Sequence, residues 1–307
     1  EACIESKTNY CDITGETHWI KEIIDKYHTK AIKNKVKIVH ACGFDSIPSD
    51  LGVFFAQNKI KENSGKYASK ISMRVISMKG GISGGTIYSF LNIIEESRKN
   101  KNIKKVLNNP HGLSPNKDLF DSDEEDLKKI IFDSTSKKWI GPFVMAAINT
   151  RIVRRSNYLM DFKYGRDFIY NEALVFGRSV LSKFLGYFRL IPIYLISKNN
   201  NTLLKSLLKS FLPKPGQGPK VNSRKNGYFK FRFYIFNNKL KALVSVNGIG
   251  CPGYGSTSKM LAESSICLAL DEIPIQNGVL TPSVALGNAL LKRLEKNADL
   301  KFRFKFL

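Results

Sequence analysis

The stretch "VKIVHACGFDSIPSDLG", residues 36–52, decides the fold. Residues 36–42 form a short and mostly apolar run, which is typical of a strand buried in a parallel sheet. A glycine, two carboxylates, two hydroxyls and a proline follow within residues 43–50. Pro48 suits the first turn of a helix, because its missing N–H is no loss there. The stretch therefore predicts a strand, a bend and a helix that runs to about Gln57, a unit typical of α/β folds.

The polar residues of this bend are the first candidates for chemistry. In doubly wound α/β folds, ligands bind beyond the carboxyl ends of the strands. Gly43 lets the backbone approach a ligand closely, and Asp45, Ser46 and Asp50 offer donors, acceptors and proton transfer. The backbone N–H groups of 45–50 can meet an anion or a developing oxyanion. A structural role, in which Asp50 or its neighbour caps the helix, is equally compatible with the spacing.

The flanking sequence repeats the alternation of helix and strand. Apolar residues at helical spacing, or a proline at a helix start, predict further helices at 17–34, 86–97, 141–159 and from Pro282. Apolar or alternating patterns predict extended segments at 71–78, 166–176, 228–248 and 300–307. The segment 228–248 is expected to be a hairpin that turns at Asn237 and Asn238. The polar segment 100–137 is expected to be a surface loop with one short helix.

Composition excludes several classes of protein. The chain has 307 residues, 43% of them hydrophobic, which indicates a globular protein with a substantial core. Its five cysteines are scattered without a CxxC pair, and its four histidines lack metal-ligand spacing. These features argue against a disulfide scaffold and a metal site, and they favour a reducing, cytoplasmic compartment. The net charge of +23 comes from dispersed lysines, so we expect a modest attraction to anionic surfaces and no nucleic-acid partner.

Three further motifs leave alternatives open. "KGGISGGT", 79–86, is either a phosphate cradle or a tight turn, and it is neither a G-x-G-x-x-G nor a P-loop pattern. "NTRIVRRSN", 149–157, is a solvated helix face or, more sharply, a phosphate or headgroup contact. In "GYGSTSKM", 253–260, a helix cap is favoured over the binding of an acidic group by Lys259.

The segment 178–212 mixes apolar, aromatic and basic residues. Its longest apolar run, 190–196, is free of charge and too short to span a bilayer. It is either a basic amphipathic element at a membrane interface or a core helix with solvated lysines, and Pro192 is expected to break the helix.

Several motifs together resemble the saccharopine dehydrogenase-like oxidoreductases, in the same order along nearly the entire chain. The motifs are "NYCDITGE", "VHACGFDSIPSDLG", "KGGISGGT", "PFVMAAINTRIVRRSN", "YGRDFIYNE", "LPKPGQGP", "GYGSTSKMLAESSICLAL" and "GVLTPSVALGNALLKRL". Within that family, the chain is most similar to the trans-acting enoyl reductase branch. The likeness is weakest over 100–137 and 178–210.

The resemblance implies a C-terminal part of a Rossmann-type doubly wound domain and a second, α+β domain with a mixed or antiparallel sheet. Residues 1–60 would be the remnant of the NAD(P)-binding domain and 61–275 the substrate and dimerisation domain. Residues 276–307 would supply a C-terminal helix and strand, with the helix returning to the first domain. The chain opens at Glu1 as if inside a fold. The resemblance therefore implies a missing N-terminal segment on the order of 80–100 residues that carries the pyrophosphate-binding glycines, which would leave this fragment inactive by itself.

The resemblance also implies a function. The complete protein would use NADP or NAD to reduce an enoyl or keto group of a lipid-like acyl intermediate, with the bend at the nicotinamide end of the cleft. The implied catalytic residues are Asp45, Ser46 and Asp50. The implied cofactor contacts are Thr14, Gly15, Gly43 and Phe44. The implied substrate contacts are Ser83, Gly84, Gly85 and Thr86.

Other functions remain as alternatives. The first is a non-catalytic, membrane- or lipid-associated scaffold that keeps the fold. A dehydrogenase acting on saccharopine ranks lower, because the arginines of 151–155 lie away from the strand-end bend. We also expect a homodimer and a peripheral membrane contact through 178–212.

Overall fold

The computed structural model describes residues 1–80, 84–122, 124–198, 218–219, 221–237 and 240–307. Two sheets organise this part of the chain, which confirms the predicted α/β class. The first is parallel, in the order β1 (Tyr10–Cys11), β2 (Lys37–Val39), β9 (Gly278–Leu280). The second is mixed, in the order β10 (Leu300–Phe306), β8 (Leu240–Ile249), β7 (Tyr228–Asn237), β3 (Lys70–Lys79), β6 (Ile169–Gly177), β5 (Lys138–Gly141), β4 (Ile131–Asp133). Among the described strands of this second sheet, only β3 and β6 run parallel to each other.

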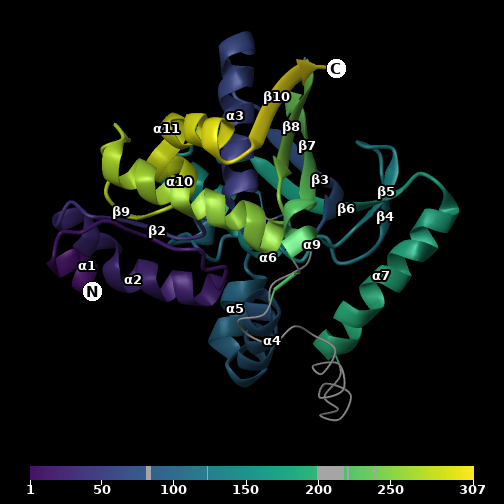
Figure 1. The fold of residues 1–307 in the computed structure, drawn as a ribbon, viewed down its shortest axis with the longest axis horizontal. Coiled ribbons are helices and arrows are strands. Elements are labelled where there is room, and N and C mark those ends of the chain that lie inside the picture. Colours follow the sequence, from purple (N-terminus) through teal and green to yellow (C-terminus); the bar gives the residue numbers. More distant parts are fainter. Residues whose placement is uncertain (81–83, 123, 199–217, 220, 238–239) are drawn as a thin grey trace.

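Helices pack on both sheets. Figure 1 shows α10 (Thr257–Leu270) and α11 (Pro282–Asn297) beside α3 (Ile47–Ser64), which packs against β7, β8 and β10. The parallel sheet is covered by α2 (Thr17–Lys33), which buries Ile20, Ile24 and Tyr27 at helical spacing. The remaining described helices are α1 (Ala2–Glu5), α4 (Gly84–Lys99), α5 (Lys101–Asn108), η1 (Lys117–Leu119), α6 (Ala146–Leu159), α7 (Val180–Lys198), α9 (Val221–Lys225) and η2 (Pro252–Ser256).

The strand, bend and helix of residues 36–64 form as predicted, with different lengths. The strand β2 is only three residues long, and Ala41 turns the chain with a φ of 61°. Helix α3 carries Pro48 in its first turn and ends at Gly65, whose φ of 71° is a left-handed C-cap that suits glycine. One hydrophobic core runs from the bend through α3 into the large sheet. The sequence boundary proposed at residue 60 therefore falls inside a shared core and remains a prediction.

The C-terminal segment serves both sheets. β9 joins the parallel sheet beside β2, whereas β10 pairs along its whole length with β8 in the other sheet. The predicted hairpin of β7 and β8 is also present. Its last described pair is Asn237 and Leu240, and residues 238–239, which include part of the predicted turn, lie outside the described residues. The boundary proposed at 275 precedes β9 and stays a prediction.

Two sequence predictions are wrong in detail. Helix α7 continues through Pro192 to Lys198, so this proline does not end it. The segment 100–137 is more than a surface loop with one helix, because it holds α5, η1 and β4 and buries residues 111–114. Residues 199–212 of the apolar and basic segment lie outside the described residues. In the described part of the chain, no helix is both long and apolar enough to cross a bilayer.

The arginines of α6 correct the prediction of a solvated face. Arg151, Arg154 and Arg155 are 2–4% exposed. Arg151 pairs with Asp126, and all three arginines donate to backbone carbonyls. Burial lowers the pKa of Arg154 and of Arg155 to about 10. These cations fix the 107–126 segment onto α6 and are not available to a phosphate or headgroup.

Candidate functional site

The loops that follow β1 and β2 meet at the carboxyl edge of the parallel sheet. Cys42 donates its N–H to the carbonyl of Asp12 over 2.7 Å, which joins the two loops. A Cβ on Gly43 would lie 3.1 Å from the Ile13 side chain, and a Cβ on Gly15 would lie 3.6 Å from a carboxylate oxygen of Asp45. The structure therefore brings together the predicted cofactor residues of the first loop and the glycine and aspartate of the second. We call residues 40–46 the bend.

A set of carboxylates surrounds this junction. Asp12 accepts a hydrogen bond from Nδ1 of His40 at 2.8 Å and from the N–H of Thr14 at 3.0 Å. Burial opposes ionisation of Asp12, but the bond and charge of His40 outweigh it and lower the pKa of the carboxyl. Glu16 likewise has a lowered pKa, because hydrogen bonds from Ser89 and Thr14 overcome its burial. Asp12 and Glu16 are thus held as carboxylates.

Asp45 behaves in the opposite way. Burial, followed by the negative charge of Glu16 and then of Asp12, raises its pKa from 3.8 to about 7. Its side chain is partly exposed, between the two loops. Asp45 therefore carries a proton at mildly acidic pH and can release it near neutrality. A carboxyl of this kind suits proton transfer, because its pKa matches the working pH.

The bend is anchored to the large sheet and to α10. The Phe44 ring is buried and contacts the rings of Phe229 and Phe231, with centroids 5.0 and 5.7 Å away. Its N–H donates to the Thr257 hydroxyl at 3.1 Å. A Cβ on Gly43 would lie 3.0 Å from the methyl group of Thr257, so the close approach of α10 favours glycine there. The Phe44 side chain thus packs on the sheet and does not make the predicted cofactor contact from this position.

Ser46 lies in a buried hydrogen-bond network. It donates to Asn149 of α6 at 3.1 Å, and Asn149 donates to Glu172 of β6 at 2.9 Å. Tyr170 donates to the second oxygen of Glu172 at 2.7 Å. Burial raises the pKa of Glu172 to about 7. The Ser46 side chain is fully buried and faces this network, away from the junction of the loops.

Asp50 lies in a second buried network. It accepts from Ser156 of α6 at 2.6 Å and from the N–H of Ser283, in the first turn of α11, at 2.8 Å. Burial raises its pKa to about 6, against the effect of these hydrogen bonds. Asp50 thus caps α11 from another helix, which is a structural role of the kind that the sequence left open. The N–H groups of 46, 47, 49 and 50 bond to carbonyls of the bend, so they are not free for an oxyanion.

Helix α4, which follows the start of the glycine-rich motif, reaches the junction. Gly80 has a φ of 123°, and a Cβ there would lie 2.3 Å from that of Cys251, so a tight turn accounts for this glycine. Ser83 lies outside the described residues. The other predicted substrate residues, Gly84, Gly85 and Thr86, open α4. The helix reaches the first loop, where Ser89 donates to Glu16, and its Glu96 lies 2.9 Å from His18.

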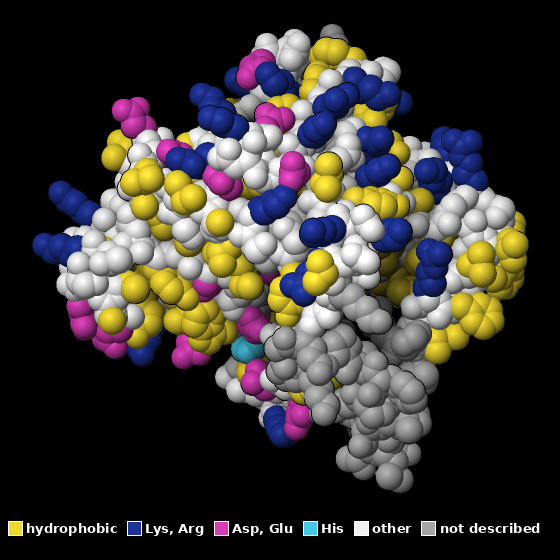
Figure 2. All heavy atoms as spheres, in the orientation of Figure 1, with side chains coloured by type: hydrophobic (Ala, Val, Ile, Leu, Met, Phe, Trp, Pro, Cys, Tyr) yellow, Lys and Arg dark blue, Asp and Glu magenta, His cyan; other side chains and the backbone are white. Residues whose placement is uncertain are grey.

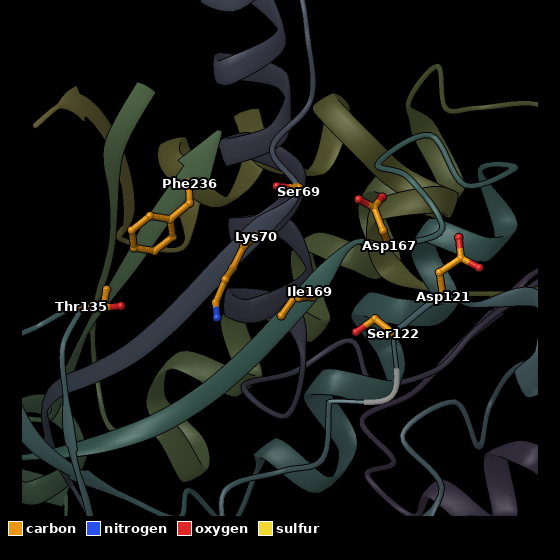
Figure 3. Close-up of a pocket in the computed structure, with 8 residues that line it drawn as sticks. All are labelled: Ser69, Lys70, Asp121, Ser122, Thr135, Asp167, Ile169 and Phe236. Carbon is orange, nitrogen blue, oxygen red and sulfur yellow. The ribbon is translucent and has the colours of Figure 1, made fainter. Parts of the chain in front are cut away.

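A pocket of about 640 Å³ lies elsewhere (Figure 3). It sits at the starts of β3 and β6, where Lys70 and Phe236 are cross-strand partners, and the carboxyls of Asp121 and Asp167 lie on its other side. The strand β3 leads away from it over ten residues, about 30 Å, toward the glycine-rich loop. Neither this pocket nor a smaller one at Tyr27 includes a residue of the bend. The candidate site is therefore defined by the meeting of the loops.

Sequence reasoning missed four residues of this site. Asp12, Glu16, His40 and Thr257 all contact the junction or its predicted residues. A signal for Asp12 and Glu16 was present, because "CDITGE" follows a strand that should end at the same edge as 36–42. Thr257 carried no such signal, because 213 residues separate it from the bend.

Comparison with known proteins gives the family. The chain is 37% identical over 306 residues to a Mycobacterium tuberculosis protein named provisionally as a trans-acting enoyl reductase, covering 95% of this chain and 73% of that protein. The chain belongs to the trans-acting enoyl reductase family. It is also 33% identical to the trans-acting enoyl reductase of Mycobacterium ulcerans and 31% to that of Mycobacterium bovis, with the same 95% and 73% coverage. No family model matches the sequence.

Membership of this family confirms the branch that the motifs resembled. Each of these matches covers 95% of the chain. The wider saccharopine dehydrogenase-like family, the cofactor and the roles of individual residues stay predictions.

Proposed function

We propose that the protein carrying this chain is an NAD(P)H-dependent reductase of the saccharopine dehydrogenase-like class, which reduces an enoyl or keto group of a lipid-like acyl intermediate. The observation that carries the proposal is a carboxyl with a pKa of about 7, Asp45, at the junction of two strand-end loops in a member of the trans-acting enoyl reductase family. Edges of this kind are where α/β folds bind nucleotides.

The residues at the junction fit one end of a nicotinamide nucleotide. The carboxylates of Asp12 and Glu16 can accept hydrogen bonds from ribose hydroxyls or a carboxamide, and they would repel a phosphate. Gly43 lets its loop approach Ile13 and Thr257 closely, and Gly15 lies beside the carboxyl of Asp45. These acceptors therefore support the nicotinamide-ribose end, which we assign to Thr14, Gly15 and Gly43.

The chemistry needs a hydride, a proton and a place for the acyl chain. When bound, the reduced nicotinamide supplies the hydride to the β-carbon of an enoyl thioester. Asp45 holds a proton near neutral pH and would deliver it to the α-carbon. Ser46 and Asp50 act as positioning residues, because their networks fix the start of α3 below Asp45. The start of α4, residues 83–86, borders the substrate side in this proposal.

The test measures oxidation of NADPH and of NADH by the longest natural form of the protein. A trans-2-enoyl thioester, a β-ketoacyl thioester and no acyl substrate are compared. We expect oxidation of the nicotinamide cofactor only when an acyl thioester is present. Mass spectrometry should show that the acyl product has gained two hydrogens. Binding of acyl thioesters without any turnover would instead favour the non-catalytic scaffold and overturn the proposal.

A further inference from the structure

Helix α7 presents a large apolar surface to solvent. Seven large apolar side chains between Val180 and Ile191 are 44–72% exposed, and Phe188 and Leu181 are the most exposed of them. The helix packs on the protein along one side, where a Cβ on Gly186 would lie 2.7 Å from the ring of Phe176 in β6. Figure 1 shows α7 standing apart from the other helices, beside β4 and β5. Soluble monomers rarely leave so much contiguous apolar surface uncovered.

The surroundings of this helix carry positive charge. The sequence of α7 includes Lys183 and Arg189 and contains no aspartate or glutamate. The strands β7, β8 and β10 also contain no aspartate or glutamate. Their cross-strand register places all of their cations on one face of the sheet: Lys230, Arg232, Lys241, Lys301, Arg303 and Lys305. Five of the six are exposed, and Arg232 is half-buried.

The apolar helix and the cationic sheet face share one side of the molecule. Figure 2 shows hydrophobic atoms along α7 and Lys and Arg side chains over β7, β8 and β10 in the same view. We propose that this side is a docking surface for an anionic lipid bilayer, in which the exposed face of α7 enters the interface and the sheet cations meet lipid headgroups. An interfacial helix needs an apolar face and neighbouring cations rather than a span across the bilayer. The charge pattern favours the bilayer over a second copy of this chain, because two cationic faces repel each other.

The test is flotation with vesicles of phosphatidylcholine alone or with 30 mol%, about one third, phosphatidylglycerol, a composition rich enough in anionic lipid for electrostatic attraction. The wild-type protein should bind the anionic vesicles and bind the neutral ones at least tenfold more weakly. The double variant Phe184→Ser and Phe188→Ser should lose at least tenfold in affinity. These side chains are 57% and 72% exposed, so their replacement should leave the fold intact. The matched control is Leu270→Ser with Ile275→Ser, which removes side chains 77% and 92% exposed outside α7 and should bind as the wild type does.

Two further arms distinguish the alternatives. The triple variant Lys301→Glu, Arg303→Glu and Lys305→Glu should lose binding to anionic vesicles. Equal binding of the wild type to neutral and anionic vesicles would overturn the proposal. Sedimentation velocity tests a second copy as the occupant. A dimer that the α7 variant dissociates, combined with no vesicle binding by the wild type, would also overturn the proposal. None of these readouts depends on reductase activity.

Discussion

Replacing Asp45 by asparagine should make the folded protein more stable at pH 8 while removing the proton that we assign to the reaction. The wild-type carboxyl lies between the loops after β1 and β2, where burial and Glu16 raise its pKa from 3.8 to about 7. Asparagine has nearly the same shape and no charge, so it avoids the cost of ionising this group. We expect a functional residue to carry such a cost more often than a structural one.

The sign and size of the effect follow from proton linkage. Unfolded Asp45 loses its proton near pH 3.8, whereas folded Asp45 keeps it until about pH 7. Between these values the folded state binds more protons, so the free energy of unfolding falls as the pH rises and levels off above about 7. The two pKa values correspond to a full effect of about 4 kcal/mol. Because the side chain keeps some contact with solvent, we expect about 2 kcal/mol.

The assay is urea denaturation of the wild type and of Asp45→Asn at pH 5 and pH 8. The variant should gain about 2 kcal/mol over the wild type at pH 8 and much less at pH 5. Asp25→Asn is the control, because that side chain is 59% exposed and its replacement should act equally at both pH values. An Asp45→Asn protein that is no more stable than the wild type at pH 8 would refute the reasoning.

Three further predictions concern the site and its supports. Gly43→Ala should lower the free energy of unfolding by about 1–2 kcal/mol, because the new methyl group meets Thr257 at 3.0 Å. In Gly15→Ala the new methyl group makes only an ordinary contact, so the free energy of unfolding should fall by less than about 0.5 kcal/mol. Equal losses of stability for the two variants in urea denaturation would contradict this packing. Arg155→Met removes donors to two buried carbonyls and should cost roughly 2–4 kcal/mol, so a variant as stable as the wild type would exclude the structural role. A hydrogen bond from a neighbouring thiol lowers the pKa of Cys11 to about 6, so its alkylation by iodoacetamide, followed by mass spectrometry, should rise with a midpoint near pH 6 rather than near 9.

Local signals in the sequence were enough to predict the α/β class, the bend before Pro48 and the hairpin of β7 and β8. Each of these depends on residues close in sequence: an apolar run followed by a proline, or alternation on both sides of a turn. The short strand β9 was not predicted, because three residues are too few to show the alternation of a strand.

The orientation of side chains at the site could not be read in the same way. Ser46 and Asp50 occur in the same polar stretch, residues 43–50, as Asp45, yet they bond to α6 and α11, more than 100 residues away in sequence. The arginines of α6 looked solvated because their partners are carbonyls, which every residue carries and no sequence pattern marks. Only the assembled fold separates Asp45, which is partly exposed, from the fully buried Ser46 and Asp50.

The most direct test of the account is the pH dependence of enoyl thioester reduction in the wild type and in Asp45→Asn. The rate constant kcat/KM of the wild type should fall as the pH rises through about 7, where Asp45 loses its proton. The variant should be slower by about 100-fold or more, with this inflection gone. A variant that keeps both the wild-type rate and the wild-type inflection would contradict the assignment of Asp45 and of the bend.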